Sequence, residues 1–286
     1  AFNKPMLRNY KISLKYWPRI CIFNSYMRLF ILLFLAFCFS TYAQDIAVKA
    51  ISKTTVETDT FVGVDEYKSL YHIKDNIFYK KESGKTYQFN DFQLGDLTHA
   101  DILNPLKIVL FYEDTNTAVI LDNTLSEIKR INFNQINEFR NIQFATTGID
   151  RNLWVFNLDL QQLELYDYNR DEIVANTQPI SETIELQKSN YNFCWLLTKS
   201  GIQKYNIYGS LMSDFKLQDV ITFTEKNGNL VIANTTSLYY LKKGNTEFQL
   251  IKLPKIDVKQ LFLDIENLYL YDGETLHHYQ LQLPKN

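Results

Sequence analysis

The stretch Asn152–Asn169, NLWVFNLDLQQLELYDYN, decides the fold. It opens with the apolar segment Leu153–Phe156, passes through a short polar reversal and continues into a second segment that ends in Tyr166-Asp167-Tyr168-Asn169. Two runs of apolar and aromatic residues on either side of a short polar reversal predict a β-hairpin. The stretch therefore predicts two antiparallel strands.

Weaker copies of this unit recur along the chain. The most apolar strand expected in each copy is centred on Ile77, Leu110, Leu153, Cys194, Leu230 and Leu268. The successive spacings are 33, 43, 41, 36 and 38 residues. A period of about 40 residues with four strands per unit is typical of β-propellers. No helical periodicity of useful length follows residue 43, so we predict an all-β fold: one six-bladed propeller with four-stranded blades.

A propeller blade buries its faces only against its neighbours, so the ring must close. We expect Ile46–Asp65 to complete the last blade by joining Leu276–Leu283 from the other end of the chain. A β-sandwich followed by a small β domain is the structural alternative. The regular spacing of the units favours the propeller.

The N-terminal segment has the pattern of a secretion signal. Met27-Arg28 precedes the apolar run Leu29–Phe39. Ser40-Thr41-Tyr42-Ala43 follows and places small residues at the two positions that a signal peptidase inspects. This pattern predicts a signal peptide over residues 27–43, with the mature chain starting at Gln44. Residues 1–26 are read as an upstream or leader extension outside the fold, and 44–286 as the propeller domain. Eleven apolar residues are too few for a bilayer-spanning helix, which needs roughly 20, so no stable transmembrane span is expected after cleavage.

Charge and cysteine content narrow the function classes. The first 43 residues hold six basic and no acidic residues, which leaves 24 basic against 32 acidic residues, a net charge of −8, for the remainder. Because nucleic-acid binding needs clustered Lys and Arg, this balance argues against it. Of the three cysteines only Cys194 lies beyond the signal, inside an apolar run, where a small core residue is expected.

Two short motifs carry a resemblance. Asn152-Leu153-Trp154 leading into Leu165-Tyr166-Asp167 resembles the blades of exported β-propellers of Bacteroidota, and the leader ending in Tyr42-Ala43-Gln44 is similar to leaders of that phylum. The resemblance covers most of residues 66–283 and implies the propeller fold and residence in the cell envelope. Some propellers of this kind are accessory parts of the type IX protein export machinery. The repeat motifs of WD40, kelch and sialidase propellers are absent.

No catalytic, cofactor-binding or metal-binding residues are predicted. His277 and His278 are adjacent, and neighbours on a strand point to opposite faces. His72 and His99 lack a companion ligand at a recognisable spacing. Asp264 and Glu266 could form the carboxylate pair of a glycosidase, but the segment around them is expected to be the turn between two strands.

The segment Asp91–Leu106, DFQLGDLTHADILNPL, is long and mixed in polarity. One interpretation makes it the outer strand of the first blade. The other places it on one face of the ring, because a long connection inside a compact domain often carries function. In that case the expected contact residues are Phe92, His99, Asp101, Asn104 and Pro105.

These observations favour a non-enzymatic, exported propeller, periplasmic or associated with the outer membrane, that binds another envelope protein as a scaffold. One alternative is an accessory component of an export complex of the type IX kind. Another is a carbohydrate-active enzyme with carboxylates in the central channel. Three or more Asp or Glu side chains converging on one channel mouth would favour the enzyme, whereas acids dispersed over rim turns would not.

Overall fold

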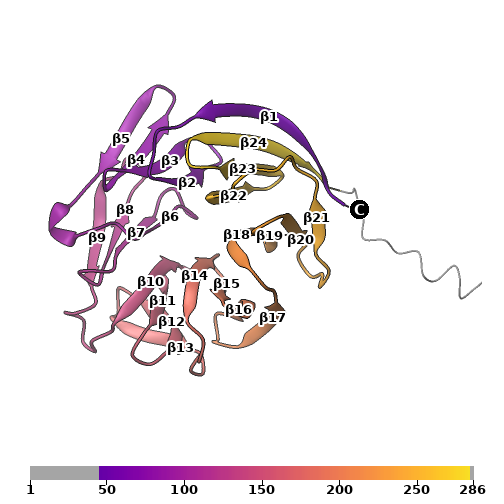
Figure 1. Ribbon diagram of the computed structural model, residues 1–286. Helices are drawn as coiled ribbons and strands as arrows, with labels where there is room; N and C mark the ends of the chain where they lie inside the picture. Colours follow the sequence, from indigo (N-terminus) through magenta and orange to yellow (C-terminus); the bar gives the residue numbers. More distant parts are fainter. Residues whose placement is uncertain (1–44, 284–286) are drawn as a thin grey trace, which may run out of the picture. The chain divides into compact units, whose positions relative to one another are not determined.

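The computed structural model describes residues 45–283, which form a six-bladed β-propeller. Each blade is a four-stranded antiparallel sheet, and β2, β6, β10, β14, β18 and β22 surround the centre of the ring (Figure 1). The predicted all-β propeller with six four-stranded blades is confirmed. The signal segment 27–43 and the extension 1–26 lie outside the described residues.

Within each blade the chain runs outward from the innermost strand. The first three blades comprise β2 (Thr60–Val64), β3 (Leu70–Lys74), β4 (Ile77–Glu82) and β5 (Lys85–Phe89); β6 (His99–Asp101), β7 (Ile108–Tyr112), β8 (Thr117–Leu121) and β9 (Glu127–Asn132); and β10 (Ile142–Thr147), β11 (Asn152–Asn157), β12 (Gln162–Asp167) and β13 (Glu172–Asn176).

The last three blades follow the same plan, except that the sixth takes its outermost strand from the start of the domain. They comprise β14 (Ile184–Ser189), β15 (Phe193–Thr198), β16 (Gly201–Asn206) and β17 (Leu211–Lys216); β18 (Val220–Lys226), β19 (Asn229–Asn234), β20 (Leu238–Leu241) and β21 (Gln249–Ile251); and β22 (Gln260–Asp264), β23 (Asn267–Tyr271), β24 (Thr275–Gln282) and β1 (Ala47–Thr55).

The ring closes through β1, which pairs antiparallel with β24 from Ala47 opposite Gln282 to Thr55 opposite Thr275. The Tyr271 hydroxyl strengthens this closure by donating to the carbonyl oxygens of Val56 and Thr58, at 3.1 and 2.9 Å. The expectation that Ile46–Asp65 completes the last blade is therefore right for its first half. Its second half is β2, the innermost strand of the first blade, because the non-strand residues 56–59 separate β1 from β2.

Six apolar clusters hold the blades together, one between each pair of neighbours. We call them the interblade cores. Along β11, Leu153 and Val155 pack toward the second blade, while Trp154 and Phe156 pack toward the fourth. Side chains alternate between the two faces of a strand, and both faces are covered here. That is why the opening stretch of sequence reads as a continuous apolar run.

Tight turns between strands fall where the sequence places them. Asp75 and Asn76 have φ values of 51° and 62°, and Asn227-Gly228 likewise has two positive φ angles, of 56° and 88°. Asn, Asp and Gly adopt this left-handed conformation at low cost, so they suit two-residue hairpin turns. Cys194 is fully buried in the core between the third and fourth blades, and burial raises the pKa of its thiol.

The outer-strand interpretation of Asp91–Leu106 is wrong. The outer strand of the first blade is β5, which ends at Phe89. The segment instead carries a short 3-10 helix, η1 (Phe92–Leu94), and then β6, the innermost strand of the second blade. No helix in the described part of the chain is long and apolar enough to cross a bilayer.

Candidate functional site: the axial pocket

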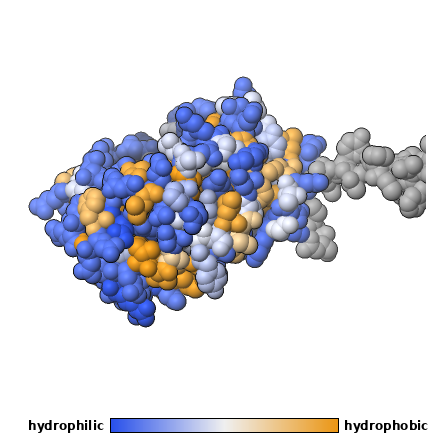
Figure 2. Space-filling view, turned by 90° about the horizontal axis from the view of Figure 1, so that it is seen from below, coloured by the Kyte–Doolittle hydropathy of each residue, from blue (hydrophilic) through white to orange (hydrophobic). Residues whose placement is uncertain are grey.

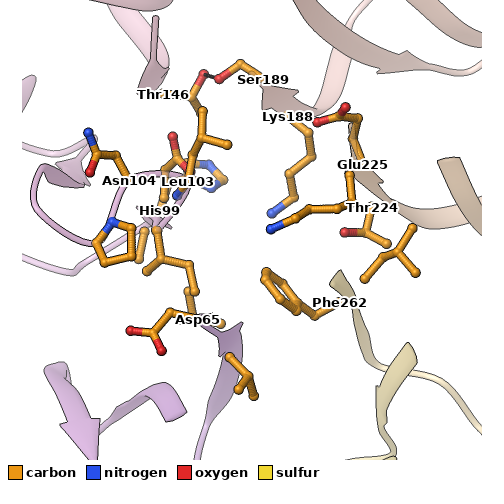
Figure 3. A pocket seen from close by; sticks show the side chains of 18 of the residues that line it. Asp65, His99, Leu103, Asn104, Thr146, Lys188, Ser189, Thr224, Glu225 and Phe262 are labelled. Carbon is orange, nitrogen blue, oxygen red and sulfur yellow. Dashed lines mark hydrogen bonds between the residues drawn. The ribbon is translucent and has the colours of Figure 1, made fainter. Parts of the chain in front are cut away.

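A cavity of about 310 Å³ lies on the axis of the ring, and residues from the innermost strands of all six blades line it (Figure 3). We call it the axial pocket. One contributor from each blade is Val64, Asp101, Thr146, Ser189, Thr224 and Leu263. These residues lie near the ends of their strands, just before the turn to the second strand. The pocket therefore opens on the face of the ring formed by these first turns.

Four of the five predicted contact residues line the axial pocket: His99, Asp101, Asn104 and Pro105. They lie on β6 and on the turn that follows it. Phe92 is not among the lining residues. It lies on η1, which precedes β6, and its side chain is 69% exposed. The structure thus brings together the residues at and after β6 and leaves Phe92 at the opposite end of that strand.

Lys188 on β14 is one of the pocket residues that sequence reasoning missed. Its side chain points toward the middle of the cavity (Figure 3), where no carboxylate of residues 45–283 forms an ion pair with it. Burial lowers the pKa of its ammonium group, and the negative charge of Asp101 opposes this shift. The Lys188 side chain is only partly buried. Because its ammonium group has no carboxylate partner among residues 45–283, it is available to pair with an incoming anion.

Two carboxylates of the pocket wall are fully engaged by the protein. Asp65 accepts hydrogen bonds from the backbone N–H groups of Tyr67 and Ser69 on one oxygen and from the Tyr71 hydroxyl on the other, at 2.8 to 2.9 Å. These bonds fix the turn after β2.

Asp101 fixes the turn after β6 in a similar way. One carboxylate oxygen accepts from the backbone N–H of Leu103 at 3.0 Å, and the other accepts from that of Thr147 on β10 at 2.7 Å. Its carboxylate therefore connects the second and third blades, and both of its oxygens are used.

Glu225 is engaged on one oxygen only. That oxygen accepts from the side-chain amide of Asn190 and the backbone N–H of Gly228, and burial raises the pKa of the carboxyl group. The second lysine of the pocket, Lys226, forms an ion pair with Asp264 at 2.9 Å. Lys226 and Lys188 therefore differ in that only Lys226 has a carboxylate partner.

His99 contributes a neutral ring to the pocket. Its imidazole lies against Phe144 with ring centroids 4.6 Å apart. Burial, and after it the charge of Lys188, lowers the pKa of His99 to about 4. At neutral pH the ring is uncharged and can donate one N–H and accept at the other nitrogen.

A buried polar network holds β14 in place beside β10. The side-chain amide of Gln187 donates to the Thr146 hydroxyl at 2.8 Å and to the Trp154 carbonyl at 3.0 Å. The Ser189 hydroxyl donates to the Thr147 carbonyl at 2.8 Å. Because its two sequence neighbours are anchored in this way, the backbone of Lys188 is fixed and its side chain extends from a rigid base.

Four exposed apolar side chains lie on the first turns of four blades, on the face where the pocket opens. We call them the apolar rim: Tyr67, Leu106, Ile265 and Tyr191, which are 69, 66, 62 and 42% exposed. Tyr191 also lines the pocket. Exposed apolar side chains also lie at the other end of the ring, at Phe92, Phe139, Leu158 and Leu160. Seen from the side of the third and fourth blades, the ring shows separate apolar patches on a mainly hydrophilic surface (Figure 2).

The other sequence-level candidates for chemistry have ordinary structural roles. His277 contacts Asp272 at 2.8 Å and His278 contacts Asn267 at 2.9 Å, on opposite faces of β24. Glu266 lies in the turn after β22, whereas Asp264 pairs with Lys226. Within residues 45–283 no group of three or more His, Cys, Asp or Glu side chains could hold a metal ion.

Comparison with known proteins supports the fold. No protein-family model and no curated protein matches the sequence. Among solved structures, the Pan2 WD40 domain of Neurospora crassa is similar with a TM-score of 0.54 and 11% identity, over 80% of this chain and 76% of that one. BamB from Moraxella catarrhalis gives a TM-score of 0.46 and 10% identity, over 82% of this chain and 99% of that one. The first similarity shows a shared propeller fold.

Proposed function

We propose that this propeller is a non-enzymatic scaffold that binds another protein through the face bearing the axial pocket and the apolar rim. One observation carries the proposal: the axial cavity opens on the same face as four exposed apolar side chains. Large apolar side chains gathered on one exposed surface are characteristic of interaction sites. Tyr is enriched at protein interfaces.

The geometry fits the usual anatomy of a protein interface. Interfaces derive most of their affinity from a few anchor side chains that enter well-packed pockets. The axial pocket offers such a space at the centre, and the apolar rim offers contact area around it. Since a closed ring of six interblade cores holds the first turns in position, binding there requires little ordering of the scaffold.

For the location, we propose that the protein is exported and works in the periplasm or at the outer membrane. The signal pattern of residues 27–43 and the resemblance to exported propellers of Bacteroidota support this location. An accessory role in a type IX export complex is a finer version of the same proposal. N-terminal sequencing of protein purified from cell-envelope fractions tests it: a mature terminus at Gln44 is expected, and an uncleaved chain in the cytoplasm would overturn it.

Photo-crosslinking tests the scaffold proposal directly. A photoreactive phenylalanine analogue replaces Tyr67 or Tyr191 in one pair of variants, and Phe92 or Phe139 in the control pair. The control positions are 69 and 57% exposed but lie on connections that lead into an innermost strand, at the other end from the pocket. We expect one discrete crosslinked partner from the first pair only. Equal crosslinking from both pairs, or none, would contradict the proposal.

A second candidate function is a carbohydrate-active enzyme, and one specific observation favours it. Four acidic residues line the axial pocket: Asp65, Glu66, Asp101 and Glu225. A glycosidase with its active site in the axial pocket would require acidic side chains that converge in this way. However, glycoside hydrolysis needs two free carboxyl groups, and only Glu66 and Glu225 keep an oxygen without a partner in the described chain. In this function Glu225, with its raised pKa, would be the proton donor.

The enzyme candidate is tested with Glu225→Gln on a panel of envelope polysaccharides. Hydrolysis by the wild-type protein that falls by about a hundredfold or more in the variant would establish the enzyme. No hydrolysis by the wild-type protein would eliminate it.

A further inference from the structure

We propose that the axial pocket recognises a carboxylate: an acidic side chain, flanked by apolar residues, that a partner protein inserts so that its carboxylate pairs with Lys188. This inference rests on the proposed scaffold function and names the chemistry of the segment that the scaffold binds. Its basis is the contrast between Lys188 and the other charged groups of the pocket.

The first step is the state of the charges in the cavity. Asp65 and Asp101 accept protein hydrogen bonds on both oxygens. Lys226 is paired with Asp264. Lys188 extends into the cavity without a carboxylate partner among residues 45–283. Of the two remaining carboxylates, Glu66 is exposed on the turn after β2 and Glu225 accepts hydrogen bonds from Asn190 and Gly228. The group that reaches the middle of the cavity without a partner is therefore the Lys188 cation, which an anion could pair with.

The second step is the cost of leaving that cation alone. Lys188 is partly buried. An ammonium group that has lost part of its hydration is less favourable without a partner, and a close ion pair with added hydrogen bonds recovers much of that cost. Asp101 cannot provide the pair, because both its oxygens accept backbone N–H groups. An incoming carboxylate would supply the missing partner, and the neutral ring of His99 could donate one further hydrogen bond to it.

The third step identifies the carrier of the carboxylate. The cavity is small, about 310 Å³, which is enough for one side chain but at the lower limit for a complete small-molecule ligand. It opens on a face bearing Tyr67, Leu106 and Ile265, all more than 60% exposed. A free organic acid would leave these apolar side chains uncovered. A peptide segment with an acidic residue between apolar residues would cover them and fill the pocket.

Binding measurements with a defined probe test the inference. The probes are a fluorescent capped peptide with a central Glu between Leu and Phe, its counterpart with Gln in place of Glu, and succinate. We expect the wild-type propeller to bind the acidic peptide with a dissociation constant below about 1 mM. The Gln peptide should bind at least about tenfold more weakly, because it lacks the charge that pairs with Lys188.

Two variants give the matched comparison. Lys188→Met should weaken binding of the acidic peptide by about tenfold or more and bring it to the level of the Gln peptide. Lys85→Met, on the exposed outer strand of the first blade, removes the same charge far from the pocket and should bind like the wild type. Circular dichroism and thermal unfolding confirm that both variants are folded.

Each other outcome overturns the inference. Equal affinity for the Glu and Gln peptides, unchanged binding by Lys188→Met, or no binding of the acidic peptide at about 1 mM would exclude carboxylate recognition. Succinate binding as tightly as the peptide would assign the site to a small organic acid. If Lys188→Met still crosslinks its partner from Tyr67 and Tyr191, the scaffold function stands and only the carboxylate inference fails.

Discussion

Trp154 lies on the third blade and Lys188 on the fourth, and their surroundings differ: Trp154 is enclosed by apolar side chains, whereas Lys188 faces a polar cavity. Trp154 is 1% exposed in an interblade core, where apolar side chains surround the ring and its indole N–H donates to the Asn190 carbonyl at 3.2 Å. Lys188 faces the axial pocket, and its ammonium group has no carboxylate partner in the described part of the chain. The interblade core is thus filled by side chains that pack against one another, whereas the pocket is a cavity that holds a cation without a carboxylate partner among residues 45–283.

This difference separates stability from binding. Substitutions in the interblade cores remove packing contacts that water cannot replace. They should therefore lower the free energy of unfolding more than they change binding at the face that bears the pocket. Substitution of Lys188, which forms no ion pair within residues 45–283, should alter binding and leave stability nearly unchanged. The four predictions below test this separation by unfolding measurements, from the largest expected effect to the smallest.

The largest effect is expected for Trp154→Ala. Truncation leaves a cavity between two blades and removes a hydrogen bond, so the free energy of unfolding should fall by about 3–5 kcal/mol. Val174→Ala on the outer strand β13, where the side chain is 53% exposed, is the control and should cost less than about 1 kcal/mol. Urea denaturation measures both. A loss below about 1 kcal/mol for Trp154→Ala would contradict the role assigned to the interblade cores.

The second prediction concerns pH and His72. Its ring is 3% exposed on β3, lies against Tyr79 with centroids 5.1 Å apart, and has its pKa lowered to about 4 by burial and, less strongly, by Lys81 and Lys74. In the unfolded chain the pKa is about 6.5. As pH falls from 6.5 to 4 the unfolded chain takes up the proton first, so stability is lost over this window, by up to about 3 kcal/mol.

His72→Phe keeps an aromatic ring and removes the titrating group. Its free energy of unfolding should therefore depend less on pH than that of the wild type between pH 6.5 and 4. Denaturation curves at pH 7.5, 5.5 and 4.5 measure the difference. Parallel pH profiles for the two proteins would show that His72 does not couple stability to acid.

A smaller effect is expected at the closure of the ring. Tyr271→Phe removes the hydroxyl that bonds to Val56 and Thr58, and stability should fall by about 1–2 kcal/mol. Tyr279→Phe on β24 is the matched control: Tyr279 is 4% exposed, and its hydroxyl has no hydrogen-bond partner within residues 45–283. Thermal unfolding should distinguish the two variants, and equal losses would show that the hydroxyl of Tyr271 does not secure the closure.

The smallest effect on stability is expected for Lys188→Met. Replacing a partly buried cation that has no carboxylate partner among residues 45–283 with an apolar side chain should leave stability unchanged or raise it by up to about 1 kcal/mol. Lys226→Met should instead lower it by about 1 kcal/mol, because Asp264 loses its partner. Denaturation of both variants in parallel gives the sign. If both substitutions lower the free energy of unfolding equally, Lys188 stabilises the fold, and the proposed separation of stability from binding is contradicted.

Sequence reasoning located the strands that lie between two interblade cores, but it missed two of the innermost strands. Strands such as β11 and β19 lie between two interblade cores, and their apolar runs are visible in the sequence. The innermost strands β6 and β14 were not predicted, and the segment around β6 was read as an outer strand or a surface connection. Both carry polar residues because one side of each faces the channel. β6 has only three residues, and in β14 the alternation that reveals a half-buried strand extends only over 184–187.

The same difference explains the site. His99, Asp101, Asn104 and Pro105 could be selected because they share one unusual segment of sequence, whereas Lys188 is one lysine among many in a chain rich in them. Phe92 was chosen on the same grounds, but the turn of the chain through η1 directs it away from the pocket. Membership of a segment could be read from the sequence, and the direction of its side chains could not.

By itself the sequence determined the ring. A hydrophobic unit repeated at about 40 residues, with turn residues between the strands, can bury its faces only against copies of itself. Tertiary structure alone decided the pocket. Its walls come from six strands spread over 200 residues of chain, from Val62 to Leu263, and whether a lysine there meets a carboxylate depends on the closed geometry of the ring, which no local pattern encodes.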